Sequence, residues 1–484
     1  MPNWLNDPQR AVYDRESGLW CLYFLYNSQF SPNPAASKNG TEWFLMTSPD
    51  LVIWTAQHVA IPKYTTENGD PWTGSVVIDE GNTAGFGKGA WIALMTMPAA
   101  PDHLQTTALW YSTDRGRHYS FHGIVMQNPY AARHDLKDKT FRDPCAFWHA
   151  PSHKWVIVLA EPEKFGFYAS SDLKVWEYTG STPPIPDYGV LECPNLFELN
   201  IQDAGGKTTG SRWVLMFGGN GFKGSMTTGT LYAVGTFDGK AFVPDRQGYS
   251  WLDSGPDFYA ATAWEDPLSS DRKSHRYAMG WMNNWGYAKD LPKHGYFGNL
   301  TTVRTLTLRG DDGKYCLVSH PVSGQERQYA RVLNGPDQQL KDGASYHLPL
   351  QPSENVYRLD FMIHRVGERW PYDIFLNLME HGSHHAQLFL SGAGNSAAVR
   401  RSVLGYTPDE GADLWRAERW GRVDYGDRLQ ITVIVEPFGI EVFLGDGRLA
   451  FTMLAFPAAQ ETGLGLRVGT GEIRVTDFVM RTRR

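Results

Sequence analysis

Residues 48–54 read Ser-Pro-Asp-Leu-Val-Ile-Trp, and this short pattern decides the fold because it recurs along the chain. A Ser/Asp turn followed by an aromatic residue returns at residues 112–121 and 171–176, and in a weaker form at residues 236–242. Each copy follows a strand-like run, such as Trp-Phe-Leu-Met at residues 43–46. A period of about 60 residues accommodates four short antiparallel strands.

A unit of that size cannot bury both faces of its own sheet, and stacking several units in a ring solves this problem. At this period, five units extend over roughly the first 318 residues. The repeat therefore predicts a five-bladed β-propeller over residues 1–320. The alternative is a β-sandwich in which the similar hairpin turns are coincidental.

The last third of the chain has a different pattern. Residues 321–345 are mostly polar and are predicted to form a linker. Alternating strand patterns follow, for example at residues 357–363 and 429–435, and Gly445-Asp446-Gly447 is a hairpin turn between two strands. Several short strands without helices predict a β-sandwich over residues 346–484, so the whole chain is expected to be all-β.

The composition narrows the class of partner. The formal net charge of the 484 residues is -7 and there is no run of Lys and Arg, so neither nucleic acid nor an anionic membrane is an expected partner. No apolar run reaches about 18 residues, so no membrane span is expected. The 18 Trp and 23 Tyr suit a carbohydrate, whose apolar faces stack on aromatic rings. Four cysteines without metal-ligand spacing indicate neither a disulfide framework nor a metal site.

Three short acidic motifs carry the chemistry. They are Asn6-Asp7-Pro8, Arg142-Asp143-Pro144 and Glu192-Cys193-Pro194. Each lies near the start of a separate repeat unit, where the innermost strand of a propeller blade would fall, so the ring should bring the three carboxyl groups together. Two carboxyl groups are the usual minimum for hydrolysis of a glycosidic bond.

In their order and surroundings these motifs resemble glycoside hydrolase family 32, which acts on β-fructofuranosides. The resemblance implies a retaining reaction in which Asp7 is the nucleophile, Glu192 the acid/base and Asp143 the transition-state stabiliser. We expect Arg142 to favour the ionised form of Asp143, and the neighbouring carboxylates to raise the pKa of Glu192. The resemblance extends over most of residues 3–308.

Further residues are predicted to bind the substrate. They belong to the acidic motifs, to Trp72-Thr73-Gly74-Ser75, or to aromatic segments, and they are Asn6, Arg142, Trp43, Trp72, Ser75, Tyr259, Trp281 and Trp285. Leu25 stands where the family often has Gln, and it cannot donate a hydrogen bond to a sugar.

The sequence therefore predicts a β-fructofuranosidase that removes terminal fructose from sucrose or a fructan, without a cofactor or metal. A fructosyltransferase, in which a sugar hydroxyl replaces water, remains an alternative because sequence barely reports acceptor positioning. Remoter alternatives are a fructan-binding protein without activity and a propeller glycosidase acting on arabinose. Secretion or export to the periplasm is expected, with a signal that this chain lacks, and a cytoplasmic location is the alternative. The sequence does not indicate an oligomeric state.

Overall fold

The computed structural model describes residues 3–28, 40–99, 104–134, 138–221, 227–292, 296–311, 314–401 and 404–483. Strands dominate these residues, and α1 (Ala412–Arg416) is the α-helix among them. The prediction of an all-β chain is confirmed. Within the described ranges no helix is both long and apolar enough to cross a bilayer.

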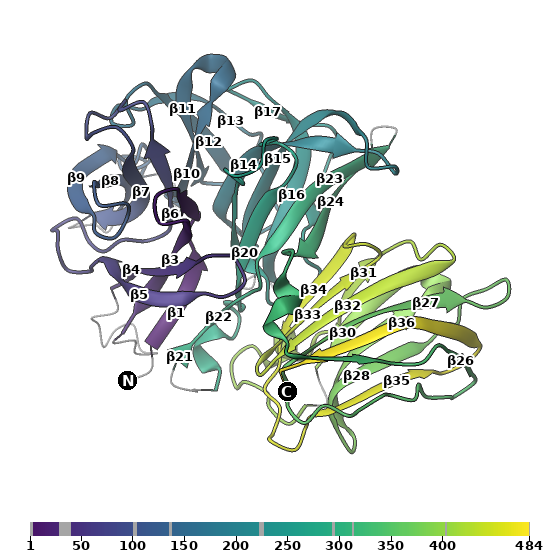
Figure 1. Cartoon of the computed structure of the whole chain (residues 1–484). Helices are drawn as coiled ribbons and strands as arrows, with labels where there is room; N and C mark the ends of the chain where they lie inside the picture. Colours follow the sequence, from purple (N-terminus) through teal and green to yellow (C-terminus); the bar gives the residue numbers. More distant parts are fainter. Residues whose placement is uncertain are drawn as a thin grey trace.

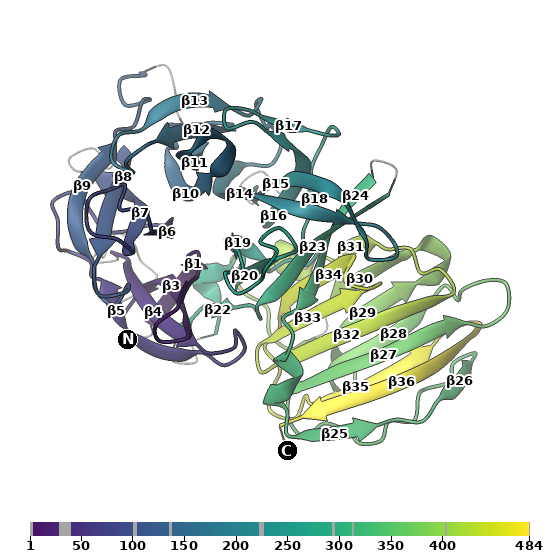
Figure 2. The same ribbon diagram turned by 45° about the horizontal axis from the view of Figure 1, so that its top comes forward.

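Residues up to 321 form sheets that surround a common centre (Figure 2), where strands β1, β6, β10, β14 and β19 lie innermost. The first sheet contains β1 (Asn3–Pro8), β2 (Val12–Asp14), β3 (Leu19–Asn27), β4 (Glu42–Ser48), β5 (Thr55–Ile61) and β21 (Tyr296–Phe297). The second contains β6 (Gly74–Asp79), β7 (Ala90–Ala99), β8 (Leu104–Ser112) and β9 (Ser120–Met126). The third contains β10 (Arg142–His149), β11 (Lys154–Glu161), β12 (Lys164–Ser170) and β13 (Glu177–Ser181).

The fourth sheet has ten strands and consists of two groups. The first group is β14 (Val190–Gln202), β15 (Thr208–Asn220), β16 (Thr228–Phe237), β17 (Phe242–Pro244) and β18 (Ser250–Trp251). The second is β19 (Tyr259–Trp264), β20 (Arg276–Met282), β22 (Asn299–Leu300), β23 (Arg304–Asp311) and β24 (Lys314–Pro321). Among the described residues, only a two-residue parallel pairing, at Ile201 and Gln202, joins the groups.

The repeated Ser/Asp turn has the same hydrogen bonds in the first, third and fourth sheets, whereas in the second sheet Asp114 Oδ1 accepts the backbone N–H of His118. Asp50 Oδ1 accepts the backbone N–H groups of Val52 and Ile53 between β4 and β5, and Asp172 Oδ1 accepts those of Lys174 and Val175 between β12 and β13. Asp238 accepts two backbone N–H groups in the same way between β16 and β17. The carboxylate thus satisfies donors that the turn would otherwise leave unpaired, which explains the periodic motif.

Buried apolar clusters lie between neighbouring sheets. The ring is closed where Trp20 and Leu22 of the first sheet pack with Trp264 and Met279 of the last. The rings of Trp20 and Tyr277 meet edge to face with centroids 5.6 Å apart. The first and last sheets therefore pack against each other.

Residues from 331 onward form two facing sheets (Figure 1) around one shared core of aliphatic and aromatic side chains. One sheet contains β25 (Arg331–Asn334), β26 (Gln338–Lys341), β27 (Tyr357–Arg365), β32 (Arg428–Glu436), β33 (Gly439–Leu444), β34 (Leu449–Leu454) and β36 (Glu472–Thr482). The other contains β28 (Ile374–His381), β29 (His384–Ser391), β30 (Ser396–Arg400), β31 (Arg419–Arg422) and β35 (Gly463–Val468).

The linker predicted over residues 321–345 is shorter than expected. Strands β25 and β26 fall within it, and both pair with β36. These strands were not predicted because their side chains are mostly polar, and an edge strand needs few apolar residues.

Buried ion pairs join the two parts of the chain. The Arg304 guanidinium is fully buried and donates to Asp253 and to Glu441, at 2.8 Å each. Arg401 donates to Asp257 at 2.5 Å, and its guanidinium lies 3.6 Å from the Trp415 ring centroid. A buried carboxylate is costly without its partner, so these contacts hold the two parts in one arrangement.

Replacing Arg304 with Met should destabilise the protein by about 3–5 kcal/mol, because two buried carboxylates lose their cation. Thermal unfolding measures the effect. The matched control is Arg272→Met, which breaks an exposed pair with Glu265 and should cost at most about 1 kcal/mol. Equal melting temperatures for the two variants would contradict this assignment.

Candidate active site

Three inner strands carry the predicted carboxyl residues, and each strand bulges at its motif. Pairing shifts register between Asn6 and Pro8 in β1, between Arg142 and Cys145 in β10, and between Glu192 and Asn195 in β14. Asp7, Asp143 and Cys193 have φ angles of 29°, 62° and 49°. Residues other than Gly rarely adopt this backbone region, and bulges of this kind redirect side chains near functional sites.

Asp7 is held on both carboxyl oxygens. Asn6 Nδ2 donates to Oδ1 at 2.9 Å, and the Thr73 hydroxyl donates to Oδ2 at 2.6 Å. Gln9 lies behind this group, where its side chain donates to the Asp7 carbonyl and accepts the Gly74 N–H. Strand β1 and the start of β6 therefore fix the orientation of Asp7 together.

Asp143 faces Asp7 across a shared neighbour, Cys193. The Cys193 N–H donates to Asp143 Oδ2 at 2.9 Å, and its Sγ lies 3.7 Å from that oxygen and 4.0 Å from Asp7 Oδ2. Burial raises the pKa of the Cys193 thiol well above its usual value, so it remains a neutral group packed between the carboxyls.

Glu192 receives three donors. Arg142 Nη1 lies 3.0 Å from Oε1, while Asn220 Nδ2, at 3.1 Å, and the Tyr259 hydroxyl both donate to Oε2. Burial raises the pKa of Tyr259 well above its usual value, so its hydroxyl keeps its proton. Strands β10, β14, β15 and β19 thus meet at one carboxyl group.

Burial dominates the electrostatics of the other two carboxyls. It raises the pKa of Asp7 to about 6, against the lowering effect of the hydrogen bonds from Thr73 and Asn6. It raises the pKa of Asp143 to about 7, although the charge of Arg142 acts in the opposite direction. Arg142 favours the ionised form of Asp143, as expected, but burial outweighs the effect of the cation, and the guanidinium hydrogen-bonds to Glu192.

The predicted aromatic residues occupy different positions. Trp281 and Trp285 form a cluster with Trp4, with centroids 4.8 to 6.0 Å apart. Trp43 is fully buried, and its indole N–H donates to the carbonyl of Trp72. Trp72 itself is partly exposed. Ser75 is also buried and bridges the backbone of Pro144 and Ala146. Their contacts with a substrate remain predictions.

Sequence reasoning missed two residues that contact the carboxyls directly. Thr73 lies inside a motif that was recognised, so its hydroxyl could have been proposed. Asn220 lies in a Gly-Gly-Asn-Gly segment without a distinctive pattern, and only the pairing of β14 with β15 brings it to Glu192.

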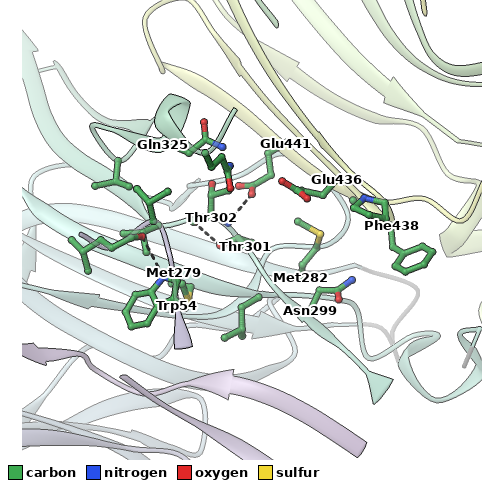
Figure 3. Close-up of a pocket in the computed structure, with 18 of the residues that line it drawn as sticks. Trp54, Met279, Met282, Asn299, Thr301, Thr302, Gln325, Glu436, Phe438 and Glu441 are labelled. Atoms are coloured by element: carbon green, nitrogen blue, oxygen red, sulfur yellow. Dashed lines mark hydrogen bonds between the residues drawn. The ribbon is translucent and has the colours of Figure 1, made fainter. Parts of the chain in front are cut away.

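One cavity lies at the carboxyl groups and a larger one lies elsewhere. Beneath the carboxyls, between the inner strands, about 10 Å³ remains, lined by Ser75, Asp143 and Asn195 among others. A cavity of about 370 Å³ lies apart from the carboxyls, between the ring and the turn from β32 to β33 (Figure 3). Leu5, Trp54, Met282 and Glu436 line it, and burial raises the pKa of Glu436 to about 7. None of the predicted site residues lines this second cavity.

Comparison with known proteins decides the family. The Glycosyl hydrolases family 32 N-terminal domain matches residues 1–321. The chain belongs to this family. It is a glycosidase, and this prediction is confirmed.

The relatives match along most of the chain. A levanbiose-producing levanase of Bacillus subtilis is 37% identical, over 96% of this chain and 85% of its own. A protein of the same name from Geobacillus stearothermophilus is 40% identical, over 73% and 85%. The crystal structure of exo-inulinase from Aspergillus awamori has a TM-score of 0.84 at 25% identity, covering 100% of this chain and 96% of that one.

Replacing Asp143 with Asn should stabilise the glycosidase at neutral pH. A buried carboxyl with a raised pKa favours folding while protonated, and this stability is lost as the pH rises from about 4 through about 7. Asn stays neutral and can still accept the Cys193 N–H, so its advantage should grow by about 1–3 kcal/mol between pH 5 and pH 8. Melting temperatures across this range test the point, and a constant difference would contradict it.

Proposed function

We propose that this protein hydrolyses levan with retention of configuration, using Asp7 as nucleophile and Glu192 as acid/base. The observation that carries the proposal is the meeting of three carboxyl groups and Arg142 at the inner strands of the ring. The levanase relatives support the choice of substrate. The buried hydrogen-bond donors and acceptors suit a neutral sugar rather than a charged ligand.

We also propose that the ring is a five-bladed propeller followed by a β-sandwich. The two groups of the ten-stranded sheet count as two blades, because a single short parallel pairing joins them. Five buried clusters then separate five blades, and the cluster around Trp20 closes the ring. Each carboxyl residue lies on the innermost strand of its blade.

In the first step Asp7 attacks the anomeric carbon of a fructosyl unit. The bond from that carbon to the leaving oxygen breaks, and Glu192 gives its proton to that oxygen. Asp7 must be ionised and Glu192 protonated at this stage. Asn6 and Thr73 aim the attacking carboxylate, while Asn220 and Tyr259 hold the acid.

In the second step water attacks the anomeric carbon of the fructosyl unit and displaces the Asp7 carboxylate. Glu192, now ionised, takes a proton from the water as the new bond forms and the ester to Asp7 breaks. Asp143 is proposed to accept hydroxyl groups of the fructosyl ring and to bind them more strongly at the transition state. A protonated Asp143 would also donate one hydrogen bond.

Several buried polar atoms at the site have no partner within the described residues. They include Arg142 Nε, Asn220 Oδ1 and the indole N–H of Trp281. Leaving such groups unpaired is costly. These atoms have almost no accessible surface, so a substrate would contact them only if the surrounding side chains move.

The pH dependence of kcat/KM should reflect the ionisation of Asp7 and its hydrogen bond with Thr73. Activity as kcat/KM should fall below about pH 6, because protonated Asp7 is not a nucleophile. Thr73→Val removes a hydrogen bond that lowers this pKa, so the acidic limb should move up by about 0.5–1 pH unit. The matched control is Thr107→Val, since that buried hydroxyl has no partner in the described part of the chain. An unmoved limb in Thr73→Val would contradict the role of Thr73.

Product analysis tests the activity itself. Purified protein is incubated with levan, inulin and sucrose, and the products are resolved by chromatography over time. We expect levan to be hydrolysed fastest, with the disaccharide levanbiose as the main early product, as the names of the relatives suggest. Free fructose from the start would instead support the prediction from sequence, and longer oligosaccharides would favour a transferase. No release from any of the three sugars would overturn the proposal.

A further inference from the structure

Three aromatic side chains form a row across the outer face of the five-stranded sheet. Phe375 of β28 pairs with Phe389 of β29, which pairs with Ala398 of β30, which pairs with Trp420 of β31. The ring centroids are 5.4 Å apart between the two Phe residues and 5.7 Å apart between Phe389 and Trp420. The alternate residues of these strands, such as Leu376 and Leu388, point into the shared core.

Trp420 is exposed and yet held in one orientation. Its side chain is 48% exposed, its indole N–H donates to Glu418 Oε2 at 3.1 Å, and its ring meets Phe389 edge to face. Exposing a large aromatic ring forfeits the free energy of burying it. An orientation fixed in advance lowers the entropy lost when a ligand stacks on the ring.

A row of hydrogen-bonded polar side chains lies beside the aromatic row. Arg400 Nη1 donates to Gln387 Oε1 at 3.1 Å, and Gln387 Nε2 donates to Asn377 Oδ1 at 2.9 Å. These three residues are directly paired across β30, β29 and β28, two positions from the aromatic row. Glu418 balances the charge of Arg400, with 2.9 Å between Oε1 and Nε.

We propose that this face is a second binding site, for a fructan chain, apart from the active site. We call it the sheet platform and define it by Phe375, Phe389, Trp420, Arg400, Gln387 and Asn377. A sugar stacks an apolar face on an aromatic ring and hydrogen-bonds its hydroxyls to amide and guanidinium groups. Arg400 is paired with Glu418, and the exposed Arg467 lies over the Phe375 ring, 4.9 Å from its centroid. Both guanidinium groups can donate hydrogen bonds to hydroxyl groups, so a polyhydroxyl chain fits the platform.

The choice of a fructan rests on the proposed function. A polymer held at the platform brings its other segments close to the active site of the same molecule, and this raises their effective concentration. Sucrose is too short to reach both sites. The platform should therefore affect polymer binding and leave the hydrolysis of sucrose unchanged.

Affinity electrophoresis in native gels containing levan tests the platform. The protein carries Asp7→Asn, so that the polymer stays intact during the run. Adding Trp420→Ala should weaken binding to levan about fivefold, and Trp420→Tyr should restore part of it. The matched control is Tyr372→Ala, which removes another exposed aromatic ring of the same part of the chain and should not change binding.

Kinetics of the active enzyme complete the test. Trp420→Ala should raise KM for levan severalfold and leave kcat and KM for sucrose unchanged. Undiminished binding of levan by Trp420→Ala would overturn the inference, as would equal retardation in gels of levan and of dextran. A shift in oligomeric state with unchanged levan binding would overturn it too, because the face would then join copies of this chain. A wild-type enzyme that releases no sugar would count against the proposed function instead.

Discussion

The gathering of three carboxyl groups, one buried and two partly buried, beside the Arg142 guanidinium is the constraint on which the site depends. Each group comes from the innermost strand of a different sheet segment, and each of those strands bulges to turn it inward. Backbone strain and desolvation both oppose this arrangement. The closed ring of buried clusters holds it, because no single strand can relax without disturbing its neighbours.

Both parts of the chain help to position Glu192, the proposed acid. The segment before Tyr259 pairs with β34 of the second part, since Ser254 N donates to the Ala450 carbonyl and Asp257 N to that of Thr452. The buried Asp257 then binds Arg401. Tyr259, two residues further on, donates to Glu192. The second part therefore supports the position of Glu192 as well as the stability of the chain.

Much of the architecture could be predicted because it rests on local chemistry. At three of its four copies the Asp of the Ser/Asp turn accepts the same two backbone N–H groups, so the repeat is visible in the sequence. The three acidic motifs lie on inner strands, Asn6-Asp7-Pro8 at the end of β1 and the other two near the starts of β10 and β14, and the ring brings them together as expected. The bulges were not predictable, because φ at Asp7 and Asp143 follows from pairing with neighbouring strands.

The rest of the site depends on long-range contacts that carry no local signal. Asn220 reaches Glu192 because of the register between β14 and β15. Arg142 hydrogen-bonds to Glu192 and not to its neighbour Asp143. The pKa of Asp143 follows from its burial, which adjacent charges in the sequence do not reveal.

The covalent intermediate provides the most direct test of the account. Glu192→Ala would be mixed with a β-fructofuranoside whose leaving group needs no acid, so that the first step proceeds and the second is slow. Mass spectrometry of the digested protein should then find one fructosyl unit on the peptide that contains Asp7. A fructosyl unit on the peptide of Asp143, or no covalent adduct during measurable turnover, would contradict the assignment of Asp7 as nucleophile.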